Sequence, residues 1–318
     1  MSSSPLASAI LQRAGLACLL VLAASAVTFA LVAAAPGNVA ALIAERAAGP
    51  GADAEMIRRI GTELGLYDPL PVRYGRWLWA ALGGDFGVSL RTGKPIATEF
   101  AARIPMTAAL LAGGGVLAFL TSLAFGLAGA VSNGGFVDRL LHTIALVGAS
   151  TPNFFVAALL VIVFSVMLGW VPTFGVSGFT SWLLPWVTIA LFPASVLSRV
   201  VRVSLQEAMS RPFATTGFAK GHTRGQVLVR EALPNIAIPF LTTFGAQFTL
   251  MVIGSIVVES VFALRGVGAF FIEAIRFRDF VGMQSVLLLF VVFFVTVNFA
   301  VDLVCMLVDP RIRRARGG

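Results

Sequence analysis

Few side chains in this chain have the types and spacing that covalent chemistry requires. The sequence holds two histidines and two cysteines, and His142 is the only histidine near a long apolar run. Hydrolysis needs a nucleophile and a base together, yet neither Gly-x-Ser-x-Gly nor His-Glu-x-x-His occurs. Cys18 and Cys305 lie in the first and last apolar runs, which argues against a disulfide framework and a metal quartet. The residues therefore disfavour an intramembrane hydrolase and predict no metal site.

The chain also lacks the loop that nucleotide-hydrolysing proteins use to hold phosphate. That loop requires Gly-Lys-Ser/Thr, in which the lysine reaches the phosphates and the hydroxyl binds Mg²⁺. The only lysines here are Lys94, followed by Pro95, and Lys220, followed by Gly221. We therefore expect this chain to be no enzyme and to bind no cofactor directly.

The elements that surround these residues belong in a lipid bilayer. Hydrophobic residues make up 58% of the chain, charged residues 12%, and the mean hydropathy is +0.92. A bilayer core of about 30 Å requires roughly 20 apolar residues per helix. This length predicts six spans, at Ala14–Ala35, Met106–Val131, Thr143–Leu168, Trp182–Ser198, Ile236–Val258 and Met283–Val308. The runs are continuously apolar and not alternating, so we predict one all-α, polytopic membrane domain over residues 1–318 and no β-barrel.

The distribution of charge predicts how these spans are oriented. If both termini are cytoplasmic, that side carries 12 Lys and Arg against four Asp and Glu. An excess of Lys and Arg marks the cytoplasmic loops of membrane proteins. Residues 36–105 then form a large periplasmic loop, and the first apolar run stays in place as an anchor. The basic residues lie on short loops tethered to spans, which disfavours nucleic acid as a partner.

A polar interruption at 199–235, between the fourth and fifth spans, predicts three consecutive helices. The fourth span continues through Met209, and Ser210 is a plausible N-cap for a second helix with Pro212 in its first turn. That short helix, Phe213–Lys220, should end at Gly221, because glycine readily takes the positive φ of a helix end.

The third helix of this loop should start after Thr223 and run to Leu233, with Pro234 leading back into the membrane. The product is a short transverse helix that two longer helices hold away from the bilayer. Such a helix can transmit force only if another protein grips it.

Polar residues inside the spans are candidates for a translocation path, because unpaired polar groups are costly in lipid. Thr243 and Gln247 share one face of the fifth span, and Asn298 and Asp302 share one face of the sixth. For Gln247 and Asn298 both pore lining and interhelical hydrogen bonding remain open, whereas pairing with a basic residue is favoured for Asp302. Asn153, beside Pro152, is a weaker candidate.

The cytoplasmic loop resembles that of the permease subunits of binding-protein-dependent ABC importers. Their coupling loop has Glu-Ala-Ala, three residues, Gly, nine residues, Ile, one residue and Leu-Pro. Here Gly221, Leu233 and Pro234 match that spacing, Glu231 replaces the Ile, and Thr215-Thr216-Gly217 replaces Glu-Ala-Ala. The resemblance implies a site that couples to ATPase subunits. Its residues would be Thr215, Thr216, Gly217, Phe218, Ala219, Lys220, Gly221, Leu233 and Pro234.

Further segments resemble the dipeptide, oligopeptide and nickel branch of that family. They are 64–77, Gly84-Asp85-Phe86-Gly87-Val88-Ser89-Leu90, Ser150-Thr151-Pro152-Asn153-Phe154-Phe155, 298–302 and Asp309-Pro310-Arg311-Ile312-Arg313. Two segments depart from the branch, Pro36-Gly37-Asn38-Val39 and Arg265-Gly266-Val267-Gly268. Both are expected to face outside, where a binding protein would make contact.

The resemblance implies a fold like that of type I ABC importer permeases, in a bacterial inner membrane. The chain would form half of the path for short peptides, or alternatively for nickel or a nickel chelate. Its partners would be a second homologous permease, two ATPase subunits that use ATP, a periplasmic substrate-binding protein and membrane lipid. A passive channel is disfavoured because no selectivity-filter run or charged ring occurs. The sequence leaves open the substrate, the partners' identity and whether the permease pair is homodimeric.

Overall fold

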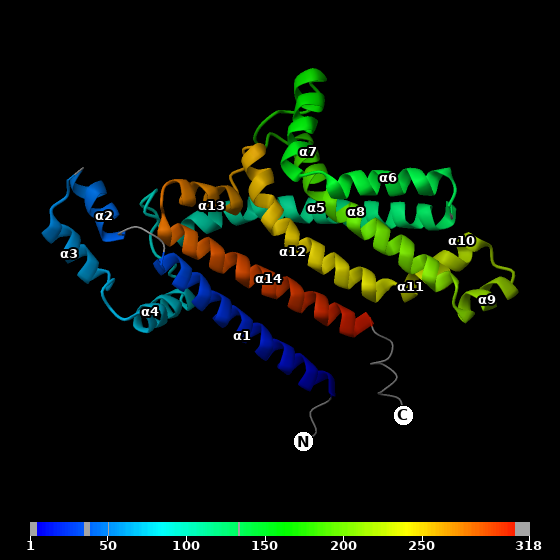
Figure 1. The fold of residues 1–318 in the computed structure, drawn as a ribbon, viewed down its shortest axis with the longest axis horizontal. Coiled ribbons are helices and arrows are strands. Elements are labelled where there is room, and N and C mark those ends of the chain that lie inside the picture. The colour runs from blue at the N-terminus through cyan, green and yellow to red at the C-terminus, as the bar shows by residue number, and fades with distance from the viewer. Residues whose placement is uncertain (1–4, 35–38, 50, 133, 309–318) are drawn as a thin grey trace. The chain divides into compact units, whose positions relative to one another are not determined.

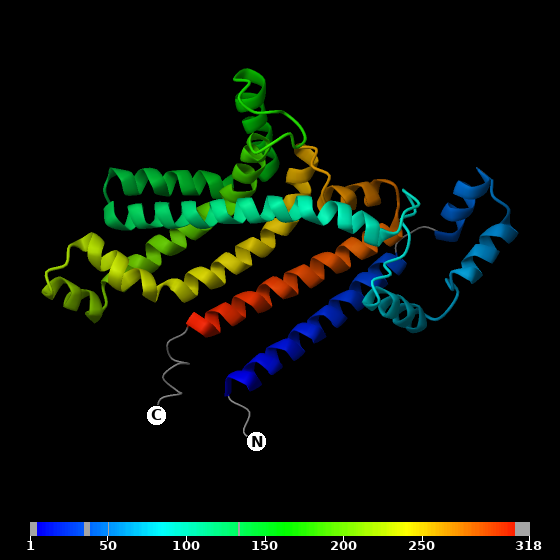
Figure 2. The same cartoon turned by 180° about the vertical axis from the view of Figure 1, so that it is seen from behind.

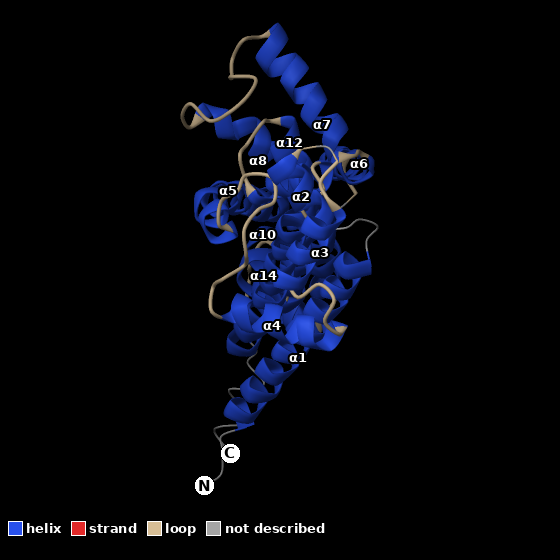
Figure 3. Cartoon of the chain, turned by 90° about the vertical axis from the view of Figure 1, so that its left-hand side faces the viewer, coloured by secondary structure: helices blue, strands red, loops and turns tan. Residues whose placement is uncertain are grey.

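The structure, a computed structural model, describes residues 5–34, 39–49, 51–132 and 134–308. Every regular element in this part of the chain is a helix, and the pairing of Val88 with Pro95 is an isolated antiparallel bridge (Figure 3). The all-α prediction is confirmed. Two segments compared with the family lie outside the described residues: Pro36-Gly37-Asn38, where the chain departs from the branch, and Asp309-Pro310-Arg311-Ile312-Arg313, where it resembles the branch.

The helices divide into two compact units, whose boundaries fall inside α5, α13 and α14. The first unit comprises Met1–Ile104 and Phe270–Val295, and the second comprises Pro105–Ala269 and Thr296–Gly318. Helices of the first unit are α1 (Pro5–Ala34), α2 (Val39–Ala48), α3 (Ala54–Glu63), α4 (Leu70–Leu82) and parts of α5 (Ile96–Ser132), α13 (Val267–Arg276) and α14 (Phe280–Val308). Helices wholly in the second unit are α6 (Phe136–Ser150), α7 (Asn153–Leu160), the π-helix η1 (Val161–Met167), α8 (Thr180–Met209), α9 (Pro212–Ala219), α10 (Arg224–Val227), the π-helix η2 (Leu228–Ala232), α11 (Leu233–Asn235) and α12 (Ala237–Val261).

Five helices in the described part of the chain are long and apolar enough to cross a membrane by themselves. They are Ile10–Ala34, Ile96–Ser132, Thr180–Met209, Ala237–Val261 and Phe280–Leu307. A sixth span would have to combine α6 with α7 and η1, and the helix direction bends by 108° between Ser150 and Asn153. The fold class is confirmed, with six spans if the bent pair counts as one.

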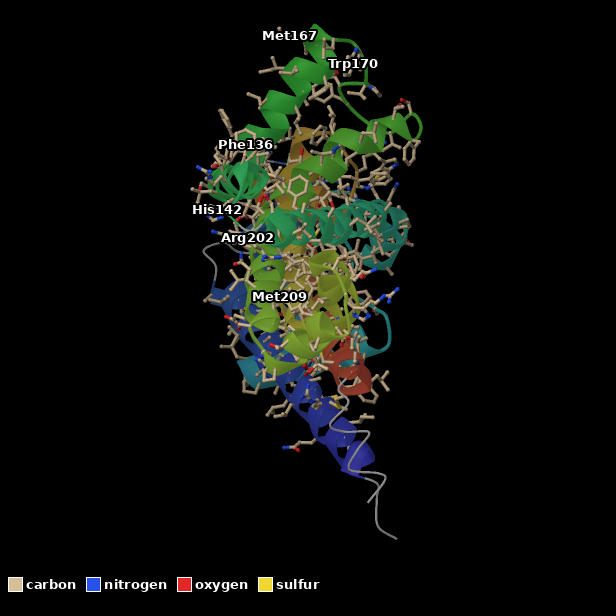
Figure 4. The ribbon with its side chains drawn as sticks, turned by 90° about the vertical axis from the view of Figure 1, so that its right-hand side faces the viewer. Phe136, His142, Met167, Trp170, Arg202 and Met209 are labelled. Atoms are coloured by element: carbon tan, nitrogen blue, oxygen red, sulfur yellow. The ribbon has the colours of Figure 1, made fainter. Side chains whose placement is uncertain are left out.

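Pro152 divides the third predicted span, Thr143–Leu168, into helices that run in different directions. Proline has no N–H to donate and disfavours helical backbone in the residue before it. Thr151 accordingly has an extended conformation, with φ −95° and ψ 126°, and α6 ends there. α7 restarts at Asn153 in a new direction and carries η1 out to Met167 and Trp170 (Figure 4).

In the second unit, α6 and α12 both pack against α8 (Figures 1 and 2). Leu197, Val201 and Leu205 recur every four residues on one face of α8 and are fully buried. The core that they form includes Phe240 of α12 and Leu228 of η2. In lipid, helices associate through close van der Waals packing and not through the hydrophobic effect. This shared core therefore joins the polar loop rigidly to two long helices.

In the first unit, the segment from Gly84 to Pro95 is fixed to the start of α14 by one buried carboxylate. Asp279 is fully buried and accepts hydrogen bonds from the Ser89 hydroxyl and from the backbone N–H groups of Leu90, at 3.1 Å, and Gly282, at 2.9 Å. These donors stabilise the negative charge of the carboxylate. The carboxylate in turn accepts from a backbone N–H in the first turn of α14, which has no partner within the helix.

Candidate coupling site

The polar loop begins as predicted, but a different residue caps the second helix. α8 continues to Met209, whereas the prediction of Ser210 as the N-cap of the next helix is wrong. The Ser210 hydroxyl donates to the Glu207 carbonyl of α8 at 2.7 Å, because that carbonyl is one of the unsatisfied groups at the helix end. Arg211 takes the N-cap position without a side-chain hydrogen bond, and Pro212 is the first residue of α9.

Gly221 ends the transverse helix α9 in the way that its sequence position predicts. Its φ is +82°, and Lys220 is the C-cap. The Gly221 N–H donates to the Phe218 carbonyl at 2.9 Å, and the His222 N–H donates to the Gly217 carbonyl at 3.3 Å. These two bonds form a Schellman motif, which requires a left-handed residue at the position of Gly221.

α9 has an inner and an outer face. Ala214 and Gly217 are buried, and a Cβ on Gly217 would lie 3.1 Å from the Val227 side chain of α10. Among the predicted coupling residues, Thr215, Thr216, Phe218, Ala219, Lys220, Gly221 and Pro234 are exposed, whereas Gly217 and Leu233 face inward. The outer face is therefore accessible to another protein. Gly217 allows α9 to pack closely against α10, because it has no side chain at that contact.

The helical return of the chain starts with a capping box that the sequence analysis missed. The Thr223 hydroxyl accepts from the Gln226 N–H at 3.4 Å, and the Gln226 side chain accepts from the Thr223 N–H at 2.9 Å. Thr-x-x-Gln is a recognised signature of a helix start, so the signal was present. Pro234 does not end the helical path, which passes through η2 and α11 into α12 at Ala237. As Pro234 has no N–H for an earlier carbonyl, the departure from regular α-helix just before it has a local cause.

An ion pair in the second unit ties α8, the helix that leads into α9, to the start of α6. Arg202 Nη2 donates to Asp138 Oδ2 at 2.7 Å, and Arg202 Nε donates to the other carboxylate oxygen (Figure 4 labels Arg202). Asp138 is 2% exposed and also accepts from the Gly134 N–H at 2.8 Å. On α5, a Cβ at Gly129 would lie 3.1 Å from the Asp138 carboxylate, so a glycine lets this third helix approach the pair.

The candidate path residues lie on α7, α12 and α14 and make separate contacts. Asn298 Nδ2 lies 3.5 Å from Thr249 Oγ1 of α12, which favours interhelical hydrogen bonding for Asn298. Thr243 donates to the Pro239 carbonyl of its own helix, and Gln247 is half-buried. A Cβ on Gly254 of α12 would lie 3.2 Å from Asn153 Nδ2. A hollow of about 340 Å³ is lined by Leu241, Phe244, Gly245, Phe248, Val297, Ala300, Val301 and Val304, and by none of the four candidates.

The segment Arg265-Gly266-Val267-Gly268, expected to face a binding protein, mostly serves the fold of this chain. Gly266, Val267 and Gly268 are buried, and a Cβ on Gly266 would lie 2.4 Å from the Glu259 carboxylate. Glu259 is fully buried and accepts from the Thr107 hydroxyl at 2.7 Å and from the Ala269 N–H, at the start of α13, at 2.9 Å. Only Arg265 of the four is exposed and open to a partner.

Comparisons with known proteins agree with the motifs and the fold. The family described as "Binding-protein-dependent transport system inner membrane component" matches residues 122–314. A model for the N-terminal part of such membrane components matches residues 6–111. The chain belongs to this family of inner-membrane transport components. It is an ABC importer permease with membrane-spanning helices, which is a transport protein and not itself an enzyme.

Named relatives of the permease are similar over nearly their whole length. A probable peptide ABC transporter permease of Sinorhizobium fredii is 36% identical over 293 residues, covering 90% of this chain and 92% of the relative. A glutathione transport system permease of Escherichia coli (strain K12) is 37% identical over 289 residues, covering 91% and 93%. An inward-facing structure of the MetNI methionine ABC transporter matches with a TM-score of 0.56 at 18% identity, covering 67% of this chain and 98% of that one. This last likeness concerns the fold alone and confirms the type I importer architecture.

Proposed function

We propose that the permease forms half of an import path for short peptides and that α9 is the helix through which partner ATPase subunits drive it. The observation that carries the proposal is the construction of α9. Its buried residues Ala214 and Gly217 lie on a support continuous with α8 and α12, while Thr215, Thr216 and Phe218 stay uncovered. A helix that is packed on one face and exposed on the other can bind a partner and transmit the partner's movement to the membrane spans.

The choice of peptides rests on the relatives and on the residues. Two of the curated relatives are named for peptide and for glutathione transport. The chain's two histidines and two cysteines give it few of the soft ligands that a bare transition metal prefers.

Partners complete the proposed transporter. A second homologous permease subunit supplies the other half of the path, two ATPase subunits bind and hydrolyse ATP, and a periplasmic binding protein delivers the substrate. Both termini are cytoplasmic in this arrangement, because the Lys and Arg excess then lies on the cytoplasmic side.

Reconstitution with these partners tests the function directly. We expect vesicles that contain the permease pair, the ATPases and a peptide-loaded binding protein to accumulate peptide only when ATP is present on the ATPase side. Vesicles without the ATPase subunits are the control. Accumulation that continues without ATP or without the ATPases would show a channel and would refute the proposal.

The orientation of α9 can be tested separately in cells. Thr216 is exposed on α9, so a Thr216→Cys variant offers an accessible thiol, and the variant Cys18→Ser/Cys305→Ser is a suitable background. We expect a membrane-impermeant maleimide to label this thiol only after the cells are opened. The matched control lies in the loop on the opposite side of the membrane: exposed Arg58 replaced by cysteine should be labelled in intact cells. Labelling of Thr216→Cys in sealed cells would place α9 outside and would remove the proposed coupling role.

A further inference from the structure

α4, in the loop expected to lie wholly outside the membrane, packs against the membrane-spanning part of α1. The Tyr74 hydroxyl donates to the Leu22 carbonyl at 3.2 Å and lies 2.8 Å from Ser25 Oγ. The Phe29 ring contacts the rings of Tyr74 and Trp77, with centroids 5.6 Å apart in both pairs. The apolar span of α1 runs from Ile10 to Ala34, so all three α1 residues lie inside it. Figures 1 and 2 both show α4 beside this part of α1.

The depth of α4 follows from helix geometry. Leu22 lies twelve residues before Ala34, or about 18 Å along α1 at a rise of roughly 1.5 Å per residue. The side of α4 that faces away from Tyr74 and Trp77 carries Val72, Trp79 and Leu82, which are 50%, 80% and 74% exposed, beside the exposed Arg76. An apolar face at the level of a membrane span is a face that lipid covers, and aromatic residues are typical of the membrane interface.

A hollow opens beside α4 within the same unit. One part, of about 540 Å³, is lined by apolar side chains that include Ile43, Trp77 and Val281. An adjoining part of about 420 Å³ shares Phe29, Val39, Leu66, Arg73 and Val281 with the first and adds Val32, Ala33, Tyr67, Phe280 and Gln284. The size and the apolar walls suit a chain of hydrocarbon.

One cation in this hollow has no carboxylate partner among the described residues. The Arg73 guanidinium lies 5.9 Å from the centroid of the Phe29 ring and makes no ion pair within the described residues. Arg76, one turn further along α4, is instead paired with Asp68 at 2.9 Å. A cation among apolar walls favours a group that brings negative charge and acceptor oxygens.

We propose that this hollow is a binding site for an anionic phospholipid, with the lipid phosphate at Arg73 and an acyl chain along Phe29 and Val281. A phosphate supplies acceptor oxygens to the guanidinium, and its charge balances that of the arginine. The acyl chain covers the apolar walls. A dissolved peptide fits this position less well, because most of the residues that line the hollow are apolar. The bound lipid would fix α4 against α1.

Native mass spectrometry of the detergent-purified full chain tests the site. We expect wild type to retain one phosphatidylglycerol more tightly than phosphatidylcholine of the same acyl length. Arg73→Gln should weaken retention of phosphatidylglycerol by about tenfold, the size typical for loss of one charge-assisted hydrogen bond. Arg73→Lys should keep most of the affinity, because it preserves the cation. The matched control is Arg58→Gln, which removes an exposed arginine of α3 in the same unit and should leave retention unchanged.

Three results would overturn the proposal. Equal retention of phosphatidylglycerol by wild type and by a monomeric, folded Arg73→Gln variant would show that Arg73 does not hold the lipid. Displacement of the lipid by millimolar inorganic phosphate would show an anion site without a place for an acyl chain. Displacement by dialanine would assign the hollow to the transported peptide. All of these measurements are independent of transport, so a failure of the proposed transport function would leave them interpretable.

Discussion

Replacing Gly221 with valine should abolish ATP-dependent uptake while the permease still inserts normally. Gly221 has a φ of +82°, a region that a β-branched residue strongly disfavours. Nothing lies within 4 Å of a Cβ built at this position, so the variant meets strain and no collision. The strain would turn the backbone away from positive φ and break the two bonds of the Schellman motif, which changes how α9 ends. The spans do not depend on that turn, so the amount of protein in the membrane should stay the same.

Matched variants separate the turn from the mere presence of a larger side chain. Gly225 lies four residues further on, has open space around its Cβ position and does not have positive φ. Gly225→Val should therefore retain most of the uptake. Gly221→Asn should fall between wild type and Gly221→Val, because asparagine tolerates the left-handed conformation better than other non-glycine residues. Wild-type uptake by Gly221→Val would contradict the coupling role of α9.

Local signals in the sequence were sufficient to predict most of the helices around the coupling site. Apolar runs of membrane-spanning length predict α1, α5, α8, α12 and α14, and Gly221 predicts the end of α9. Local competition was harder to predict. Ser210 could cap either helix, and its hydroxyl bonds back to the helix that it ends. Pro152 was recognised in a motif, yet the size of the bend that follows it depends on how α7 packs against α8 and α12.

Pairings between distant residues could not be predicted from single-sequence patterns. Arg202 and Asp138 are 64 residues apart, and Thr107 and Glu259 are 152 apart. Their charge and polarity are visible in the sequence, but which groups meet depends on how the helices assemble. The same holds for α4, because nothing in its sequence shows that Tyr74 reaches Leu22 of α1.

Breaking the ion pair between Asp138 and Arg202 should have two effects at once: it should destabilise the second unit and it should lower ATP-dependent uptake. Asp138 is 2% exposed and the Arg202 side chain is 27% exposed, so the pair is largely sheltered from water. Removing one partner of a fully buried pair costs about 3–5 kcal/mol, because the other charge is left without compensation. The Arg202 side chain is 27% exposed, so its charge is not fully buried after the partner is removed. We therefore expect a smaller loss of stability, about 2 kcal/mol, for Asp138→Asn. The measurement is the midpoint of thermal unfolding in detergent, followed by uptake.

The double variant Asp138→Asn/Arg202→Gln shows whether the lost free energy belongs to the pair itself. If the two side chains act on each other, the double variant should lose less than the sum of the single variants, by about 1 kcal/mol or more. The pair between Arg59 and Glu63 is the matched control, since its side chains are 80% and 60% exposed. An exposed pair contributes about 0–1 kcal/mol, so Glu63→Gln should barely move the midpoint. Strict additivity at Asp138 and Arg202 would mean that α6 and α8 are held by packing alone. Uptake by the single variants would then fall in proportion to the amount of folded protein. It would not depend on how the ion pair positions α8, the helix that leads into α9.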